Sequence, residues 1–232
     1  MKWLLPIVLS LIFIGCKGNA EEKVKLENQS DKVSYSIGLD IGRGFHQQGV
    51  DINPEALLQG IKDGLAGGKT MMTEEEMQST MEKFQSEMMA KYEASSRDVG
   101  EKNLKEGAAF LAENRTKEGV VVTASGLQYK IVTAGTGPTP KATDRVTVHY
   151  RGTLISGKVF DSSYDRGEPI TFEVNGVIQG WQEALQIMPV GSKWELYIPG
   201  DLAYGPRGAG PDIGPNAVLI FTVELLGIKS TE

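Results

Sequence analysis

Apolar residues recur with two different periods along this chain. From residue 31 to about residue 115 they fall at helical spacing, as with Val33, Ile37 and Ile41, which lie four residues apart. Beyond about residue 119 the period changes to two, the spacing of a strand that buries one of its faces. The pattern predicts a helical region followed by a region built mainly of strands.

Capping signals mark the bounds of a helix in the first region. Asn53 followed by Pro54 is typical of a helix start, and Gly67 with Gly68 ends the same helix. The residues of its apolar stripe are Leu57, Ile61 and Leu65. The first region therefore holds at least two short helices before any longer one.

A third and longer helix is predicted from the capping-box pattern of Thr73 and Glu76. We expect it to run past Gly100 and Gly107, which are weak points because glycine costs about 1 kcal/mol relative to alanine inside a helix. Its apolar face carries Met77, Met81, Phe84, Met88 and Tyr92, and the helix continues through Leu104, Ala108 and Leu111.

Three helices of this kind, two of them short, cannot easily enclose a core. We expect the long helix to pack against a second copy of the chain, so that residues 31–115 form a dimerisation domain. Six of the eight methionines lie between Met71 and Met89. Because a flexible thioether adapts to many shapes, these methionines suit either a dimer core or the binding of varied client proteins.

The second region alternates apolar and polar residues in several short segments, which predicts an antiparallel sheet with one apolar face. In "VIQGWQEALQIM", Val177, Trp181 and Leu185 return to helical spacing, so one short helix should cover that face. The expected fold is α+β in this half, preceded by an all-α half. The residues expected to face inward are Leu127, Tyr129, Ile131, Val146, Val148, Tyr150, Trp194, Leu196, Ile198, Ala217, Leu219, Phe221, Val223 and Leu225.

The first residues predict export. The mostly apolar "WLLPIVLSLIFIGC" is shorter than the roughly 20 residues that span a bilayer, as in a signal peptide. Cys16, the only cysteine, ends this run and resembles the lipidated cysteine of bacterial lipoproteins; a plain secretory signal is the alternative. We expect a lipoprotein signal peptide over 1–16, a polar tether over 17–30, the helical domain over 31–115 and a second domain over 119–228.

The net charge and the small number of histidines limit the kinds of partner and active site that the sequence predicts. The net charge of -6, without a dense Lys/Arg cluster, argues against a nucleic-acid partner. His46 and His149 are the only histidines, so neither a metal centre nor a histidine-based triad is predicted, and strand alternation turns His149 toward solvent. Asp161 and Asp165 are two carboxylates that a glycosidase could use, but nothing else in the sequence suggests a sugar cleft.

Residues 119–228 closely resemble the FKBP-type peptidyl-prolyl cis-trans isomerases. The stretch "VTVHYRGTLISGKVFDSSYDRGEPITFEVNGVIQGWQEALQIMPVGSKWELYIPGDLAYGPRGAG" carries the family's aromatic, acidic, glycine and proline positions almost without a break. The helical half is similar, by helix order, to the dimerisation region of the macrophage infectivity potentiator and FkpA subgroup. The resemblance implies a sheet wrapped on one short helix, a long connecting helix, and an isomerase of Xaa-Pro bonds that needs no cofactor or metal.

The resemblance also implies a pocket for proline. Trp181 would be its floor and Tyr204 would donate a hydrogen bond to a substrate carbonyl. Asp161 would either interact with the twisting imide or pair with Arg166 to fix a loop, and both remain open. The family has an aromatic residue in place of Ile170 and, in some members, a histidine in place of Ala209. The positions implied as catalytic are Asp161, Tyr204, Phe160, Trp181 and Phe221, and those implied as substrate-binding are Tyr150, Arg166, Phe172, Val177, Ile178 and Ile213.

Export and the resemblance together suggest the partners. We expect proline-containing unfolded or nascent exported proteins as substrates, in the bacterial periplasm or cell envelope. Lys17 follows Cys16 in place of the aspartate that retains some lipoproteins at the inner membrane, so the lipid anchor is expected at the outer membrane. The alternative function is a dimeric client-binding chaperone with isomerisation secondary. Family membership also implies that macrolide inhibitors can occupy the pocket.

Overall fold

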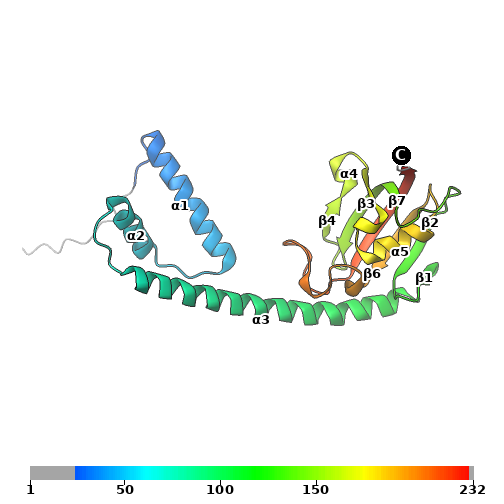
Figure 1. The fold of residues 1–232 in the computed structure, drawn as a ribbon, viewed down its shortest axis with the longest axis horizontal. Helices are drawn as coiled ribbons and strands as arrows, with labels where there is room; N and C mark the ends of the chain where they lie inside the picture. Colours follow the sequence, from blue (N-terminus) through cyan, green and yellow to red (C-terminus); the bar gives the residue numbers. More distant parts are fainter. Residues whose placement is uncertain (1–23, 230–232) are drawn as a thin grey trace, which may run out of the picture. The chain divides into compact units, whose positions relative to one another are not determined.

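The structure, a computed structural model, describes residues 24–229 (Figure 1). The chain divides into two compact units, the first ending at Glu74 and the second beginning at Glu75. The predicted signal peptide, Cys16 and the first half of the predicted tether lie outside the described residues. Over residues 24–229, no helix has both the length and the apolar character that crossing a bilayer requires.

The first unit holds two capped helices, α1 (Gln29–Gln48) and α2 (Pro54–Ala66). The side chain of Asn28 caps α1 by accepting a backbone N–H of the first turn at 2.9 Å. Asn53 caps α2 in the same way at 3.0 Å, with proline at the first helical position. Gly67 ends α2 in a left-handed conformation, so the predicted start and end of this helix are confirmed.

The apolar stripes of α1 and α2 are exposed. Neither helix contains a buried residue, and Ile37 and Ile61 are 56% and 48% exposed. A stripe at regular helical spacing is ordinarily the side of a helix that packs against a partner. The first unit therefore presents apolar side chains that its own residues do not cover.

The third helix, α3 (Glu74–Asn114), is continuous, as the sequence predicts. The helix does not break at Gly100 or Gly107, and both are buried where α3 packs on the strand-containing part of the second unit. A Cβ atom on Gly107 would lie 2.7 Å from Cγ2 of Val218, and one on Gly100 would lie 3.2 Å from Cβ of Pro215. Glycine at these positions permits a close approach that any side chain would obstruct.

A seven-stranded sheet follows α3 in the second unit, and all of its pairings are antiparallel. The strand order is β1-β2-β6-β7-β3-β4, with β5 paired to β3, so the last strand along the chain is central in the sheet. The strands are β1 (Val120–Val122), β2 (Gln128–Thr133), β3 (Arg145–Leu154), β4 (Val159–Ser162), β5 (Ile170–Glu173), β6 (Lys193–Ile198) and β7 (Leu219–Lys229).

One short helix, α5 (Gln179–Ile187), lies against a face of the sheet, as predicted (Figure 1). Trp181 and Leu185 of this helix are buried against the strands, and the expected alternation is confirmed in β3, β6 and β7. The buried strand residues are Val146, Val148, Tyr150, Trp194, Leu196, Ile198, Leu219, Phe221, Val223 and Leu225. The remaining helical segments are α4 (Ser163–Arg166), η1 (Val174–Gly176), η2 (Gly200–Leu202) and η3 (Gly205–Arg207). The α+β fold expected from the sequence is thus confirmed.

Two predicted orientations are wrong. The alternation predicts Ile131 in the core, and Ile131 does pair with the buried Trp194 of β6, but its side chain is 47% exposed. His149 was expected in solvent but is half-buried. Its Nδ1 lies 2.9 Å from Oγ of Ser163, and its ring stacks on Tyr164 with centroids 4.7 Å apart. The short helix α4 covers this outer face of β3, which strand alternation alone does not indicate.

Candidate functional site

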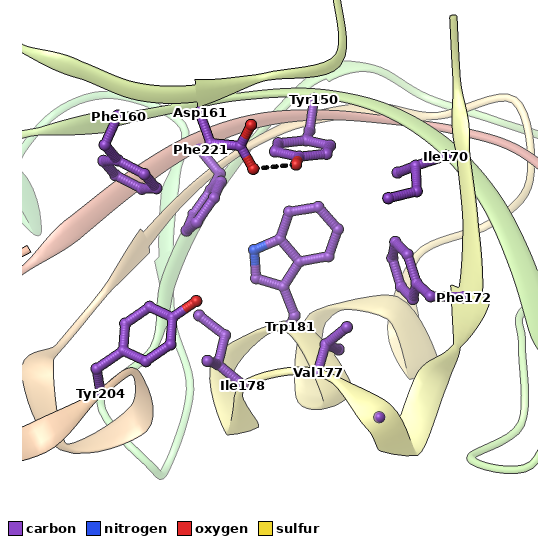
Figure 2. Close-up of a pocket in the computed structure, with 11 residues that line it drawn as sticks. Tyr150, Phe160, Asp161, Ile170, Phe172, Val177, Ile178, Trp181, Tyr204 and Phe221 are labelled. Carbon is purple, nitrogen blue, oxygen red and sulfur yellow. Dashed lines mark hydrogen bonds between the residues drawn. The ribbon is translucent and has the colours of Figure 1, made fainter. Parts of the chain in front are cut away.

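A cavity of about 490 Å³ opens in the second unit beside α5. Figure 2 shows side chains pointing into it from the sheet, from the start of α5 and from the connection between β6 and β7. Most of these side chains are aromatic or aliphatic, and the polar groups are few. The lining residues are Tyr150, Phe160, Asp161, Ile170, Phe172, Gly176, Val177, Ile178, Trp181, Tyr204 and Phe221.

Trp181 lies at the centre of the cavity (Figure 2) and is only 4% exposed. Its position depends on the preceding Gly180, since a Cβ atom there would lie 2.4 Å from Cγ2 of Ile198. The indole ring is nearly perpendicular to the rings of Tyr150 and Phe221, with centroids 5.4 and 5.1 Å away. Edge-to-face packing of this kind fixes the ring and leaves a rigid apolar floor.

Phe160 and Phe221 form one wall of the cavity, with centroids 5.5 Å apart at 87°. Gly152 of β3 makes this pairing possible, because a Cβ atom there would lie 2.6 Å from Cζ of Phe160 and 2.8 Å from Cε1 of Phe221. Sequence reasoning did not single out Gly152. Its signal is present, since glycine inside a predicted strand indicates a close approach by another group.

Three polar side chains meet beside this wall. The hydroxyl of Tyr150 donates a hydrogen bond to the Asp161 carboxylate (Figure 2), and Nη1 of Arg166 donates another to the same carboxylate. Nη2 of Arg166 donates to the Tyr150 hydroxyl oxygen at 2.9 Å, and the guanidinium lies 5.6 Å from the Tyr150 ring centroid. Each group is thus engaged by the other two, and we call this set the Tyr150–Asp161–Arg166 cluster.

The cluster sets the protonation states of its members. Partial burial raises the pKa of Asp161, but hydrogen bonds from Tyr150 and Arg166 and the positive charge of Arg166 outweigh burial and leave that pKa lowered. Burial, followed by the hydrogen bond to Asp161, raises the pKa of Tyr150. Around neutral pH the site therefore contains an ionised carboxylate and a protonated phenol, with no group poised to exchange a proton.

The serines beside Asp161 have structural roles. Ser162 caps α4 by accepting the backbone N–H of Asp165 at 3.2 Å. Ser163 is fully buried, and its Oγ accepts the backbone N–H of Tyr150 at 2.8 Å. These bonds fasten α4 to β3, which places Arg166 against Asp161 and excludes both serines from the cavity.

Nine of the implied site residues line the cavity, whereas Arg166 and Ile213 do not. Arg166 acts at its edge through the cluster. Ile213 is buried and pairs with Ala209, their backbones exchanging hydrogen bonds of 2.8 and 3.1 Å, so it shapes the loop that follows Tyr204. Gly176 lines the cavity without having been predicted. Ile170, noted above only as a departure from the family pattern, lines it too.

No group of three or more His, Cys, Asp or Glu side chains gathers at a possible metal site within residues 24–229. Asp161 has its hydrogen-bonding capacity directed to Tyr150 and Arg166. What the cavity offers chemically is an apolar slot with one ionised carboxylate and one accessible phenol, that of Tyr204, which is 41% exposed. Such a site suits binding and conformational chemistry.

Comparison with known proteins gives two family matches. Residues 30–131 match the domain amino-terminal to FKBP-type peptidyl-prolyl isomerase, and residues 137–226 match FKBP-type peptidyl-prolyl cis-trans isomerase. Among curated relatives, the chain is 51% identical over 210 residues to the outer membrane protein MIP of Legionella longbeachae, covering 90% of each chain. It is 42% identical over 228 residues to the peptidyl-prolyl cis-trans isomerase Mip of Coxiella burnetii, covering 98% of each.

Among solved structures, the chain is similar to FkpA from Escherichia coli. The TM-score is 0.67 at 35% sequence identity, and the match covers 90% of this chain and 100% of the other. The similarity thus extends over the helical half as well as the sheet.

Proposed function

The chain belongs to the FKBP-type peptidyl-prolyl cis-trans isomerases, and on this premise we propose that its cavity binds proline and accelerates rotation of the preceding imide bond. Phe160, Trp181 and Phe221 enclose the proline ring in this proposal. The remaining substrate contacts come from Tyr150, Phe172, Val177, Ile178 and, through the loop that it shapes, Ile213. The observation that carries the proposal is the aromatic slot around Trp181, in which polar side chains are few.

The physical basis is removal of water from the bond that rotates. Resonance holds an amide planar against a barrier of about 18–20 kcal/mol, and Xaa-Pro bonds isomerise unaided in about 10–100 s. Water stabilises the polarised carbonyl of the planar form. A slot that strips this water and fits the twisted imide lowers the barrier, and each 1.36 kcal/mol of lowering gives about a tenfold gain in rate.

Two polar groups complete the proposed mechanism. The exposed hydroxyl of Tyr204 donates a hydrogen bond to a substrate carbonyl and so orients the peptide. The Asp161 carboxylate, kept ionised by Arg166, faces the carbonyl carbon of the twisting imide. Because the Asp161 carboxylate also accepts hydrogen bonds from Arg166 and Tyr150, the same group has a direct role toward the substrate and a structural role in the cluster. No bond is made or broken in this mechanism.

The test is the rate of cis-to-trans relaxation of a proline-containing peptide, measured by NMR exchange in the presence of residues 17–232 at micromolar concentration. We expect relaxation many times faster than the uncatalysed process, and a Trp181→Leu variant that remains folded but loses most of the acceleration. A relaxation rate equal to that of the peptide alone would contradict the proposed function.

A second candidate function is chaperone-like binding of unfolded clients. Apolar side chains on the helices are exposed, including Met81 and Met89 of α3 at 52% and 61%, and methionine suits varied partners. If this activity is separate, a Tyr204→Phe variant should still suppress aggregation of an unfolded client while its isomerase activity falls. Loss of both activities together would leave isomerisation as the single function.

Assembly and location complete the proposal. The uncovered stripes of α1 and α2 favour a homodimer formed through residues 31–115, with the isomerase domain over 119–228. One relative is named an outer membrane protein; together with the export signal and Cys16, this supports a lipid-anchored protein of the periplasm or outer membrane acting on exported proteins. The aromatic slot is also where a macrolide inhibitor would bind.

A further inference from the structure

The connection between β6 and β7, which carries Tyr204, is held from outside the pocket by α3. Nδ2 of Asn103 on α3 donates a hydrogen bond to the backbone carbonyl of Pro215 at 2.8 Å. Figure 1 shows this connection (orange) beside α3. The helix therefore contacts the same loop that supplies a side chain to the substrate cavity.

Glycines allow this contact to be close. Gly100 of α3 is buried, and a Cβ atom there would lie 3.2 Å from both Cβ of Pro215 and Nδ2 of Asn216. From the loop side, a Cβ atom on Gly214 would lie 3.2 Å from Nδ2 of Asn103. Neither surface has room for an additional methyl group without a shift of the loop.

One backbone hydrogen bond links the residue after Pro215 to the residue after Tyr204. The backbone N–H of Asn216 donates to the carbonyl of Gly205, the residue after Tyr204, at 2.7 Å. Gly200 packs on the same residue, since a Cβ atom there would lie 2.6 Å from the Asn216 carbonyl oxygen. Within residues 24–229, Asn216 is the one non-glycine residue with a left-handed backbone (φ 57°), a strained conformation that its neighbours must maintain.

We propose that Asn103 is a positioning residue for the isomerase pocket. By holding Pro215 it keeps Asn216 in its left-handed conformation, and Asn216 fixes the segment from Gly200 to Gly205 on which Tyr204 stands. The inference rests on the role proposed above for Tyr204. It assigns to α3, which lies in the region matched to the amino-terminal domain, a part in shaping the substrate site.

Two substitutions in the full chain remove this hydrogen bond in different ways. Asn103→Ala deletes the amide, and Asn103→Asp keeps the size of the side chain but cannot donate. Both should lower kcat/KM for a Xaa-Pro peptide by about two- to tenfold, the effect of one hydrogen bond, and should shift the backbone amide NMR signals of Tyr204 and Gly205. Gly100→Ala should shift the same signals although alanine favours a helix.

Asn114 provides a matched control on the same helix. Its Nδ2 donates to Oε1 of Gln128 at 3.0 Å, so it also joins α3 to the sheet, but it has no link to the Tyr204 loop. Asn114→Ala should lower the Tm while leaving kcat/KM and the Tyr204 signals unchanged.

Unchanged Tyr204 and Gly205 signals in Asn103→Ala would overturn the proposal, as would equal signal shifts and activity loss in Asn114→Ala. A wild-type chain that does not accelerate the peptide would refute the proposed function instead. In that event the NMR comparison would still decide whether Asn103 positions the loop.

Discussion

The Tyr150 hydroxyl donates its hydrogen bond to the Asp161 carboxylate at the edge of the cavity, which both residues line. Two groups that would serve as acid and base in a hydrolase are therefore directed at each other. Arg166 completes the arrangement by bonding to both. The cluster places the charged groups on one side of the slot, and the Tyr204 hydroxyl is the polar group away from it.

Replacing Asp161 tests how far the cluster contributes to activity. Asp161→Asn removes the negative charge while keeping the side-chain shape, and we expect about a tenfold fall in kcat/KM, in keeping with loss of one charge-assisted hydrogen-bond partner. The matched control is Asp212→Asn in the Lys158–Asp212 ion pair (2.7 Å), which has similar exposure and does not line the cavity. If Arg166→Ala causes the same loss as Asp161→Asn, the role of Asp161 is structural; a larger loss for Asp161→Asn indicates direct contact with the substrate.

The activity should be nearly independent of pH between about 5 and 8. The pKa of Asp161 is lowered and that of Tyr150 is raised, so neither changes protonation in this window. Because the folded pKa of Asp161 lies below its unfolded value of about 3.9, its contribution to stability is present above that value and is lost as pH falls through the folded pKa. Peptide NMR exchange rates and urea unfolding across pH 3–8 measure both effects. A bell-shaped rate profile centred in this window would show that proton transfer takes part.

The contact between α3 and the sheet predicts an unfavourable Gly107→Ala substitution. Alanine favours the helix by about 1 kcal/mol, but its Cβ would lie 2.7 Å from Cγ2 of Val218, and overpacking costs about 1–3 kcal/mol. We expect a net loss of roughly 1 kcal/mol in the free energy of unfolding, measured by urea titration. Val218→Ala should recover part of it in the double variant. Ala108→Gly, at an exposed neighbouring position, measures the free-energy cost of replacing alanine with glycine in this helix without the contact to Val218.

A charge on the exposed stripe of α1 should weaken the proposed dimer. Ile37 is 56% exposed, so Ile37→Glu should leave the helix content by circular dichroism unchanged. In sedimentation, the wild type should behave as a dimer and the variant should dissociate at protein concentrations where the wild type does not. Lys62→Glu on α2 is a charge-change control outside the stripe. A monomeric wild type would refute the dimer.

Local patterns predicted most of the second unit because burial alternates along β6 and along most of β3 and β7. They failed where tertiary packing decides exposure: Ile131 is exposed although it pairs with the buried Trp194, and His149 is covered by α4. The family resemblance supplied the lining residues. Gly100 allows a close contact with Pro215 and Asn216, more than a hundred residues away along the chain. The local sequence around Gly100 cannot predict that contact.

The central place of β7 has a consequence for synthesis. Phe221 lies on this strand, and the β1-β2-β6 part of the sheet is joined to β3 and its neighbours only through β7. A ribosome releases the chain from its N-terminus, so α1, α2 and α3 emerge first and the slot cannot close until β7 has been made. A single molecule therefore cannot catalyse proline isomerisation during its own folding, because its pocket forms only when the sheet is complete.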